Sequence, residues 1–401
     1  MNMAQDKKRP RVLIAHQGCV PIYRKALYER LAAIPDIEYV VLHGKPPRNS
    51  DLLAAQEPYD FANIRMDPVE WSSFGMQVIY QPIVGRAWAG EFDGFVLGDE
   101  LKFISSIPIM LFAKLRGWPV VLWGFGYHPE FSVTGSNRPM GRFLTRVAGL
   151  FKVPIYRLID GYLAYTEAGV DHLTASGVAR DRIAVLRNTI DVEAQRILKR
   201  KIEQEPLADS FRFFGFDGSF PVLLYFGRFL PAKHVDLAIE YVRRAGSQGR
   251  KVGLLIFGDG AEETHLRERA RGLDTVRFLK HDDLALSRAL RIAAAVVIPG
   301  FVGLAITHAF AHGTPMITRA GLMHSPEGEY LKHGENGLLL PKDLEAFFRG
   351  LDAYLQDREL QQRLRAGAAA TAEEFQIGNM AKAFDGLVRR TLLAHGLLSA
   401  K

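Results

Sequence analysis

The sequence is short of several residues and patterns that define whole classes of protein. Its 401 residues include one cysteine, Cys19, so it forms neither an intrachain disulfide nor a zinc site built from cysteines, and this usage fits a reducing compartment. It has no run of about 18 apolar residues, the length of a membrane-spanning helix. The first apolar run, Val12 to Ala15, is too short for a secretory signal. We therefore expect a cytoplasmic protein.

Acidic residues are fewer than basic ones, and the difference is unevenly spread. The net charge is +7, and residues 101–160 hold eight Lys or Arg against two acidic residues. Such a segment indicates either a solvated basic face or a surface that meets anionic lipid or an anionic acceptor. No DNA-reading motif or aromatic-and-basic RNA signature accompanies it, so nucleic acid is not an expected partner. Within it, PMGRFLTRVAGLFKVPIYRLID (139–160) has the composition of an interfacial amphipathic helix, and core packing with a basic outer face explains it equally well.

Short apolar runs alternate with helical patterns along most of the chain. This alternation is typical of βαβ units with a mainly parallel sheet. The rhythm stops at 191–220, which we expect to be a linker. We predict an α/β protein with two doubly wound, Rossmann-like domains facing a central cleft, over 1–205 and 206–375, followed by a helical tail over 376–401. The expected strands are 11–15, 38–43, 94–97, 120–123, 161–165, 183–186, 222–226, 251–257, 276–279, 294–298 and 315–318.

The loops that follow the strands should carry the chemistry, because ligands of such domains bind beyond the carboxyl ends of the strands. After the expected strand 222–226, Gly227 opens a turn, and Arg228 and Lys233 follow. Two cations at a strand end suit a diphosphate, because Arg can fork two oxygens and Lys supplies a compact charge. A pair of solvated surface cations is the alternative.

Two glycine-bearing turns follow the next strands. In the turn at 257–260, Gly258 and Gly260 allow the backbone to approach a ligand. In PGFVGLAITHAFAHGTPMI (299–317), a turn runs into a helix that we expect to begin at Gly303, with the free amides of Val302, Gly303 and Leu304 favouring an anion. The first strand is followed by HQGCVPIYRKAL instead of G-x-G-x-x-G, which argues against a dinucleotide-binding dehydrogenase.

Histidines four residues apart, His308 and His312, raise the question of a zinc site in this helix. The run HAFAH lacks the glutamate of H-E-x-x-H and no third ligand is evident, so we expect no metal. His312, directly before Gly313, is more simply a histidine that complements the dipole at the end of the helix. Near the amino terminus, His16, Gly18 and Arg24 follow the first strand and are candidates to bind an acceptor, with a structural turn and a surface cation as the alternative.

Taken in order, these segments carry a resemblance to a known family. GRFLPAK, IFGDG, GLAITHAFAHGTPMI and EYLKHGENGLLLP resemble the donor-binding domain of family 4 GT-B retaining glycosyltransferases, and VPIYRKALYERLA and 164–192 resemble the first half of such enzymes. The resemblance covers nearly the whole chain. It implies transfer of a sugar, with retained configuration and without metal or cofactor, from a UDP- or GDP-linked donor to a glycan or lipid-linked acceptor in polysaccharide or glycolipid assembly.

The resemblance also implies roles for individual residues. Arg228 and Lys233 would be the catalytic cations that stabilise the leaving diphosphate, and a tail helix near 381–393 would brace the first domain. Phe278 and Lys280 would line the base. The remaining donor contacts would come from Gly227, Gly258, Asp259, Gly300, Phe301, Val302, Gly303, Leu304, His308 and Glu329.

The sequence departs from the family at the two glutamates of an E-x7-E motif. Gly300 and His308 occupy these places, and His308 can still form a hydrogen bond with a ribose hydroxyl. Glu327 and Glu329 in the later loop HSPEGEY are candidates to replace the carboxylate missing at Gly300.

A further departure lies in the first domain. Relatives carry a histidine where this sequence has Phe125, and His128 follows three residues later; both are expected on the acceptor side. We interpret the departures as a subgroup with altered donor contacts. Two alternatives stay open: a non-catalytic nucleotide-sugar-binding subunit, favoured by Gly300 and His308, and a nucleotide-sugar epimerase on the same scaffold. If the acceptor is lipid-linked, the protein would work at the inner face of the membrane and contact its anionic surface.

Overall fold

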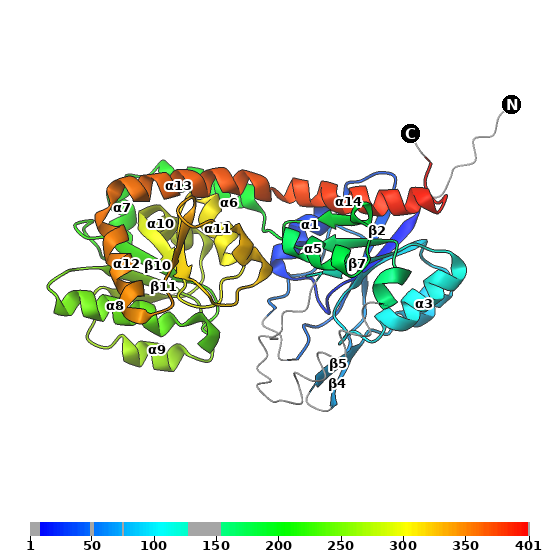
Figure 1. Cartoon of the computed structure of the whole chain (residues 1–401), viewed down its shortest axis with the longest axis horizontal. Coiled ribbons are helices and arrows are strands. Elements are labelled where there is room, and N and C mark those ends of the chain that lie inside the picture. Colours follow the sequence, from blue (N-terminus) through cyan, green and yellow to red (C-terminus); the bar gives the residue numbers. More distant parts are fainter. Residues whose placement is uncertain (1–8, 49–51, 74–75, 127–153, 400–401) are drawn as a thin grey trace. The chain divides into compact units, whose positions relative to one another are not determined.

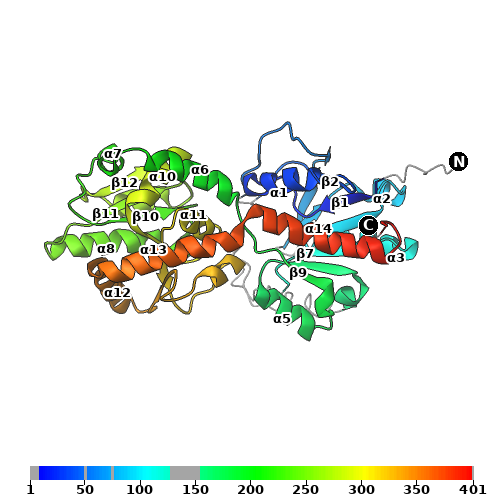
Figure 2. The same ribbon diagram turned by 90° about the horizontal axis from the view of Figure 1, so that it is seen from above.

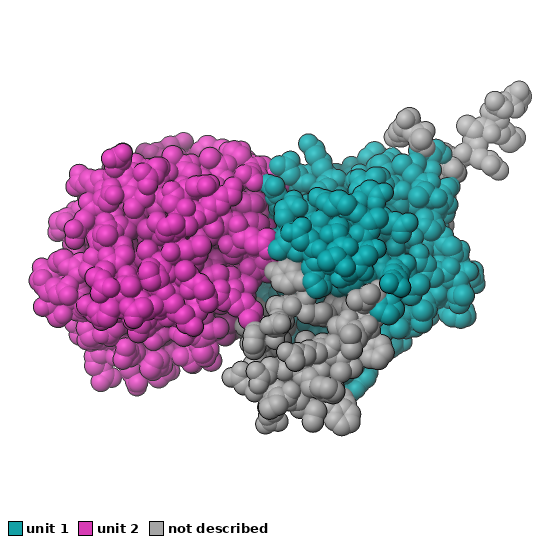
Figure 3. Space-filling view, viewed as in Figure 1, with its two compact units in different colours: residues 1–187, 377–401 teal, residues 188–376 magenta. Residues whose placement is uncertain are grey.

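The computed structural model describes residues 9–48, 52–73, 76–126 and 154–399, and the chain divides into two compact units (Figure 3). Unit 1 contains residues 1–187 and 377–401, and unit 2 contains residues 188–376. His128 and most of the segment 139–160 lie outside the described residues.

Unit 1 is built on a seven-stranded parallel sheet in the order β3-β2-β1-β6-β7-β8-β9. Its first strand has Val12 and Ile14 on one face and Leu13 and Ala15 on the other, and the two pairs enter different hydrophobic cores. Both faces are therefore covered, as a doubly wound sheet requires. The strands are β1 (Arg11–Ala15), β2 (Glu38–His43), β3 (Asn63–Arg65), β6 (Gly94–Gly98), β7 (Val120–Gly124), β8 (Gly161–Ala164) and β9 (Ile183–Val185), with a separate antiparallel hairpin of β4 (Val69–Ser73) and β5 (Met76–Tyr80).

The end of the chain completes unit 1. Helix α14 (Ile377–Ala394) packs on α1 (Ile22–Ala32) and along β8, and Figure 2 shows it lying over the sheet of unit 1. A hydrogen bond from Tyr39 Oη to Asp385 Oδ1 (2.8 Å) and an ion pair between Arg389 and Asp36 (2.6 Å) fix it there. Within the described residues, unit 1 also contains α2 (Val84–Trp88), α3 (Ser106–Arg116), a helical stretch at 154–158, α5 (Glu167–Ala175) and the 3-10 turn η1 (Arg180–Arg182).

Unit 2 is a second α/β layer structure, with a parallel sheet in the order β12-β11-β10-β13-β14-β15 (Figure 1). The central strands are buried throughout, so their sequences read as continuous apolar runs. The strands are β10 (Val222–Phe226), β11 (Gly253–Phe257), β12 (Val276–Leu279), β13 (Ala293–Val297), β14 (Met316–Arg319) and β15 (Gly337–Leu340). The helices are α6 (Val192–Glu203), α7 (Leu207–Phe213), α8 (Val235–Ser247), α9 (Glu263–Arg269), α10 (Asp283–Ile292), α11 (Ala305–Ala311), α12 (Leu344–Gln356) and α13 (Arg358–Ala372), with 3-10 turns η2 (Pro231–Lys233), η3 (Pro326–Tyr330) and η4 (Glu373–Phe375).

The expected linker at 191–220 is wrong, because this segment forms α6 and α7. The Asp191 carboxylate caps α6 by accepting a hydrogen bond from the Ala194 amide (3.1 Å), and α6 packs on α10 and α11. These contacts place residues 188–205 in unit 2, whereas the sequence assigned them to the first domain. The strands β3, β4, β5 and β15 were not expected; β3 and β15 are short strands at sheet edges, and β4 and β5 form a small hairpin. No helix of the described residues is long and apolar enough to cross a membrane.

Candidate functional site

The sheet of unit 2 has a switch point between β10 and β13, where the order of strands reverses direction. The loops that leave neighbouring strands at such a point diverge and open a ligand site at the carboxyl edge of the sheet. The loop after β10 carries Arg228 and Lys233, and the loop after β13 carries 299–304. The structure therefore brings together the cations and the glycine-bearing turn that lie about 70 residues apart in the sequence.

Lys233 lies at the centre of this switch point. It ends η2, and its Nζ donates a hydrogen bond to the Phe301 carbonyl (2.6 Å) and lies 5.1 Å from the centre of the Phe301 ring. A Cβ built on Gly303 would lie 3.9 Å from the same Nζ. Burial lowers the pKa of Lys233 to about 8, against the opposing charge of Glu327. A cation held with so little solvation gains strongly from an incoming anion.

Arg228 lies closer to solvent at the start of the same loop. Its Nη1 donates to Asp259 Oδ1, and the side chains of Arg228 and Asp259 are 40% and 71% exposed. The Arg228 carbonyl accepts a hydrogen bond from Tyr225 Oη (2.8 Å), which fixes the backbone. The backbone of Arg228 is thus anchored, and the contact of its guanidinium with Asp259 is an exposed one that a diphosphate could replace.

The turn at 257–260 requires glycine at two positions for a structural reason that the sequence did not show. A Cβ on Gly258 would lie 2.0 Å from the Gly227 carbonyl oxygen, and one on Gly260 would lie 2.6 Å from the Phe229 carbonyl oxygen. Both glycines have φ near +150°, a region that L side chains rarely adopt. These glycines therefore allow two protein loops to approach each other. From the sequence we had inferred that they allow the backbone to approach a ligand.

Gly300 is held against the loop after β10. A Cβ at this position would lie 2.1 Å from the Ala232 carbonyl oxygen, and the same oxygen accepts a hydrogen bond from the Phe301 amide (2.8 Å). Thr318 Oγ1 donates to the Gly300 carbonyl (3.2 Å) and Arg319 Nε donates to the Pro299 carbonyl (2.7 Å). In this structure position 300 has no room for any side chain, so it can contact a ligand only through its backbone.

The helix expected to begin at Gly303 begins at Ala305 and is short. The Val302 amide is not free, because it donates to His324 Nδ1 (3.2 Å). The amides of Gly303 and Leu304 have no acceptor among the described residues. Two of the three amides that we expected to face an anion thus stay available, beside Lys233.

His308 on α11 and His312, the residue directly after this helix, are neutral at neutral pH. Burial lowers the pKa of His308 to about 4 and that of His312 to about 3. His308 lies edge-on to Phe226 with ring centres 6.0 Å apart, and its Nδ1 is buried without a partner among the described residues. His312 Nε2 lies 3.4 Å from Gln195 Oε1, so it does not supply the positive charge that we expected at the end of the helix. No group of three His, Cys, Asp or Glu in the described part of the chain could hold a metal ion.

The loop after β14 contains Glu327 and Glu329, the two candidates for the missing carboxylate, and also Ser325, which the sequence did not indicate. Glu327 is buried and accepts a hydrogen bond from Asn188 Nδ2, whereas Glu329 is exposed. Ser325 Oγ is buried without a partner in the described structure and lies 3.8 Å from the Cβ position of Gly303. The signal that points to Ser325 and Asn188 is topological: each follows a strand pattern at the carboxyl edge of a sheet.

The residues expected to line the base lie further along the sheet. Phe278 is on β12, with its ring 6.3 Å from that of Phe229 and 4.7 Å below the Arg267 guanidinium, and Lys280 is exposed. Because β11 separates β12 from β10, these residues lie two strands away from Lys233.

Unit 1 has its own switch point, between β1 and β6, and the candidates for acceptor binding lie beside it. The His16 ring stacks on Trp123 (3.9 Å), and burial holds the pKa of His16 well below its ordinary value. Arg24 is fully buried, lies 4.6 Å over the Trp123 ring and donates to Tyr165 Oη (3.1 Å), so it is not a surface cation. The Phe125 ring lies 5.2 Å from that of Tyr165. Gly18 packs on Pro47, where a Cβ would lie 2.8 Å from Pro47 Cγ.

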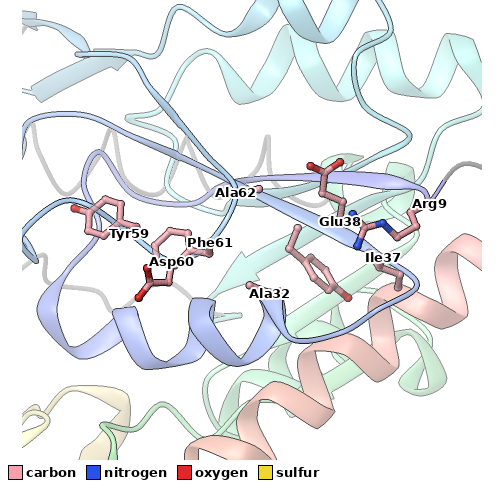
Figure 4. A pocket seen from close by; sticks show the side chains of 9 residues that line it. Arg9, Ala32, Ile37, Glu38, Tyr59, Asp60, Phe61 and Ala62 are labelled. Atoms are coloured by element: carbon pink, nitrogen blue, oxygen red, sulfur yellow. The ribbon is translucent and has the colours of Figure 1, made fainter.

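A hollow of about 400 Å³ in unit 1 lies elsewhere (Figure 4). It is next to Glu38, the first residue of β2, and therefore at the amino end of that strand. Ligands of doubly wound sheets bind at the opposite edge, so this hollow is not part of the candidate site. Its lining residues are Arg9, Ala32, Ile37, Glu38, Tyr39, Tyr59, Asp60, Phe61 and Ala62.

Comparison with known proteins agrees with the resemblance seen in the sequence. Residues 197–371 match the family described as glycosyl transferases group 1. A segment of 175 residues is 29% identical to an exopolysaccharide phosphotransferase of Streptomyces coelicolor, covering 41% of this chain and 18% of that protein. A segment of 190 residues is 30% identical to a D-inositol 3-phosphate glycosyltransferase of Jonesia denitrificans, covering 43% of this chain and 44% of that protein. The chain thus spans less than half the length of the curated relatives that it matches.

The fold is similar to that of solved structures over most of the chain. The Anabaena protein HepE, solved in complex with UDP, superimposes with a TM-score of 0.64 at 15% identity, covering 95% of this chain and all of that one. This similarity confirms the GT-B fold class with two Rossmann-like domains.

Proposed function

We propose that this chain, which carries a group 1 glycosyl transferase domain over residues 197–371, transfers a sugar from a nucleotide-sugar donor to a hydroxyl of a glycan or lipid-linked acceptor. The observation that carries the proposal is the position of Lys233. Its ammonium lies at the switch point of unit 2, beside Gly303 and the available amides of Gly303 and Leu304. This arrangement of a poorly solvated cation and free N–H groups suits the diphosphate of a nucleotide sugar.

In this proposal the diphosphate is the leaving group. As the bond between the sugar and the diphosphate oxygen breaks, negative charge builds on that oxygen. Lys233 and Arg228 would stabilise the charge, aided by the amides of Gly303 and Leu304. These residues replace the metal ion that other transferases use for the same purpose, so we propose a metal-independent reaction without a cofactor. Retention of configuration is proposed on the resemblance to family 4.

Donor recognition would use the side chains around this cation. We propose that His308, neutral at neutral pH, forms a hydrogen bond with the ribose. We assign the role of the missing sugar carboxylate to Glu327 rather than Glu329. The support is that Glu327 is buried, is held by Asn188 and interacts electrostatically with Lys233. Glu329 is exposed to solvent. UDP is the nucleotide that we expect first, because HepE is solved with it.

The acceptor would bind at the carboxyl edge of the unit 1 sheet, near His16 and Phe125. We propose that it is a growing glycan, free or lipid-linked, in cell-surface polysaccharide assembly. The support is the name of the Streptomyces relative, an exopolysaccharide phosphotransferase, and the basic composition of 101–160. The single cysteine favours the cytoplasm as the compartment, at the inner face of the membrane.

A binding and transfer experiment tests this function. Melting temperature is measured with UDP-, GDP- and dTDP-sugars, because a ligand that binds only the folded protein raises it. Nucleotide release is then measured with glycan acceptors in the presence of EDTA. Arg228→Ala and Lys233→Ala should lose release, while Lys251→Ala, an exposed lysine of unit 2, should retain it. Binding without release would favour a non-catalytic subunit, and conversion of the donor sugar without acceptor would favour an epimerase.

A further inference from the structure

Helix α3 of unit 1 presents apolar side chains on both its inner and its outer side. Its inner residues enter the core, but Ile107, Leu111 and Leu115 are 40%, 50% and 83% exposed. Their spacing of four places them along one face of the helix. An ordinary surface helix carries polar residues on its outer face, so this stripe requires a reason.

The exposed stripe continues onto α2 through a tryptophan. Trp88 is 59% exposed and stacks on Phe112 of α3, with ring centres 4.0 Å apart. We call Trp88, Ile107, Leu111 and Leu115 the α3 face. In Figures 1 and 2, α3 lies at the rim of unit 1. An apolar face formed by two neighbouring helices on the outside of a unit marks an interaction surface.

The charges around the α3 face are cationic or neutralised. Helix α3 contains no acidic residue and ends with Lys114 and Arg116. Asp160 is paired with Lys114 (2.9 Å), and Glu91 is paired with Arg86 (2.6 Å). Arg116 lies 5.0 Å over the Phe112 ring and has no acidic partner among the described residues. An exposed tryptophan with aliphatic side chains and a neighbouring arginine is the composition of an element that lies in a membrane interface.

We propose that the α3 face binds the surface of an anionic membrane, with its four side chains entering the headgroup layer. A second copy of the chain is the competing occupant. A stable dimer buries about 20 to 30 residues on each partner, far more than this face offers, whereas a few apolar side chains supported by cations suffice for reversible lipid binding. The proposal does not depend on the sugar-nucleotide site, because all its residues belong to unit 1, whereas Lys233 and the turn after β13 belong to unit 2.

Sedimentation with lipid vesicles tests the proposal. The full chain is mixed with vesicles of phosphatidylcholine, with and without phosphatidylglycerol, at low and physiological salt. The wild type should sediment with the anionic vesicles, and less of it at the higher salt concentration. The double variant Leu111→Gln, Leu115→Gln should bind at least about tenfold more weakly, because it removes two apolar side chains from the contact.

Ile197→Gln is the matched control, since Ile197 is a 55% exposed apolar residue on a helix of unit 2. This variant should bind vesicles as the wild type does, and unchanged circular dichroism melting would show that each variant is folded. The proposal is overturned if the wild type stays in solution or if the double variant sediments equally well. It is also overturned if light scattering shows a wild-type dimer that the double variant dissociates, because a second copy would then cover the face.

Discussion

Replacing Lys233 with methionine should stabilise the protein while removing its response to UDP. Methionine keeps the length of the apolar stem and removes the ammonium that burial destabilises. We thus expect the positive charge of Lys233 to be needed for binding the diphosphate. The same charge should lower the stability of the protein without ligand.

The size of the effect follows from the pKa of Lys233, which burial lowers from 10.5 to about 8. At about 1.4 kcal/mol per pKa unit, charging this lysine in the folded state costs about 3 kcal/mol near pH 7. The variant leaves the Phe301 carbonyl without its hydrogen bond from Nζ, at a cost of about 1 kcal/mol. The net gain is then about 2 kcal/mol, which corresponds to about 4 to 8 °C in melting temperature for a unit of this size.

The pH dependence of the stability provides a second test of the charge at Lys233. Between pH 8 and 10.5 the unfolded lysine still holds its proton and the folded one does not, so the stability of the wild type rises with pH in this window. The advantage of Lys233→Met should therefore shrink by about 2 kcal/mol between about pH 7 and pH 9.5. Melting curves by differential scanning calorimetry, recorded at both pH values with and without UDP, measure both effects.

Lys251 supplies the control for this measurement. It is an exposed lysine of the same unit, with its Nζ 4.5 Å from the Phe220 ring. Lys251→Met should change neither the UDP response nor its pH dependence. If Lys233→Met melted below the wild type at both pH values and still responded to UDP, burial of a binding cation would be the wrong description of this site.

Three further changes test other parts of the structure. Arg228→Ala should weaken UDP binding about tenfold or more by calorimetric titration, because a charged hydrogen-bond donor to the diphosphate is lost, whereas Asp259→Asn should retain binding. Gly300→Ala should destabilise the fold by about 3 kcal/mol or more in urea unfolding, since its Cβ meets the backbone, while Gly303→Ala has room for its Cβ and should leave stability unchanged. The free energy of unfolding should fall as the pH drops from 6.5 towards 3, because His312 binds a proton in the unfolded state while the buried ring stays neutral in the folded state. In His312→Gln this fall should be smaller by about 2 to 4 kcal/mol.

The architecture was predictable where one physical signal dominates. Buried parallel strands read as apolar runs, so β1, β2 and β10 have the expected bounds, and the bounds of the partly buried edge strand β12 also match. The cations after β10 and the turn after β13 could be selected as candidates from the sequence, because strand ends in such sheets lead into ligand sites. The amphipathic pattern of α6 was obscured by its many charges, and its assignment to unit 2 depends on packing with α10 and α11 that no local pattern shows.

Burial and contacts over long sequence distances account for what the sequence argument missed. Arg24 was a candidate to bind the acceptor, with a surface cation as the alternative, but it is buried over Trp123 and donates to a tyrosine 141 residues away. His312 has the position of a helix-capping cation, and burial makes it neutral. Asn188 and Glu327 meet across 139 residues of sequence. Composition and spacing do not encode such encounters, because they arise from the tertiary fold.

Gly300 is a position where both the sequence pattern and the tertiary packing matter. From the sequence, this glycine is the place of a missing glutamate, and the question was which residue supplies its carboxylate. In the structure, the Gly300 backbone lies against Ala232 so closely that a Cβ would be 2.1 Å from a carbonyl oxygen. The same approach positions the Phe301 carbonyl to accept the hydrogen bond from Lys233. A glutamate at position 300 would therefore disrupt the contact that holds the cation. On the proposed function, the carboxylate that binds the sugar would therefore come from another loop, and the buried Glu327 after β14 is the residue that we propose for this role.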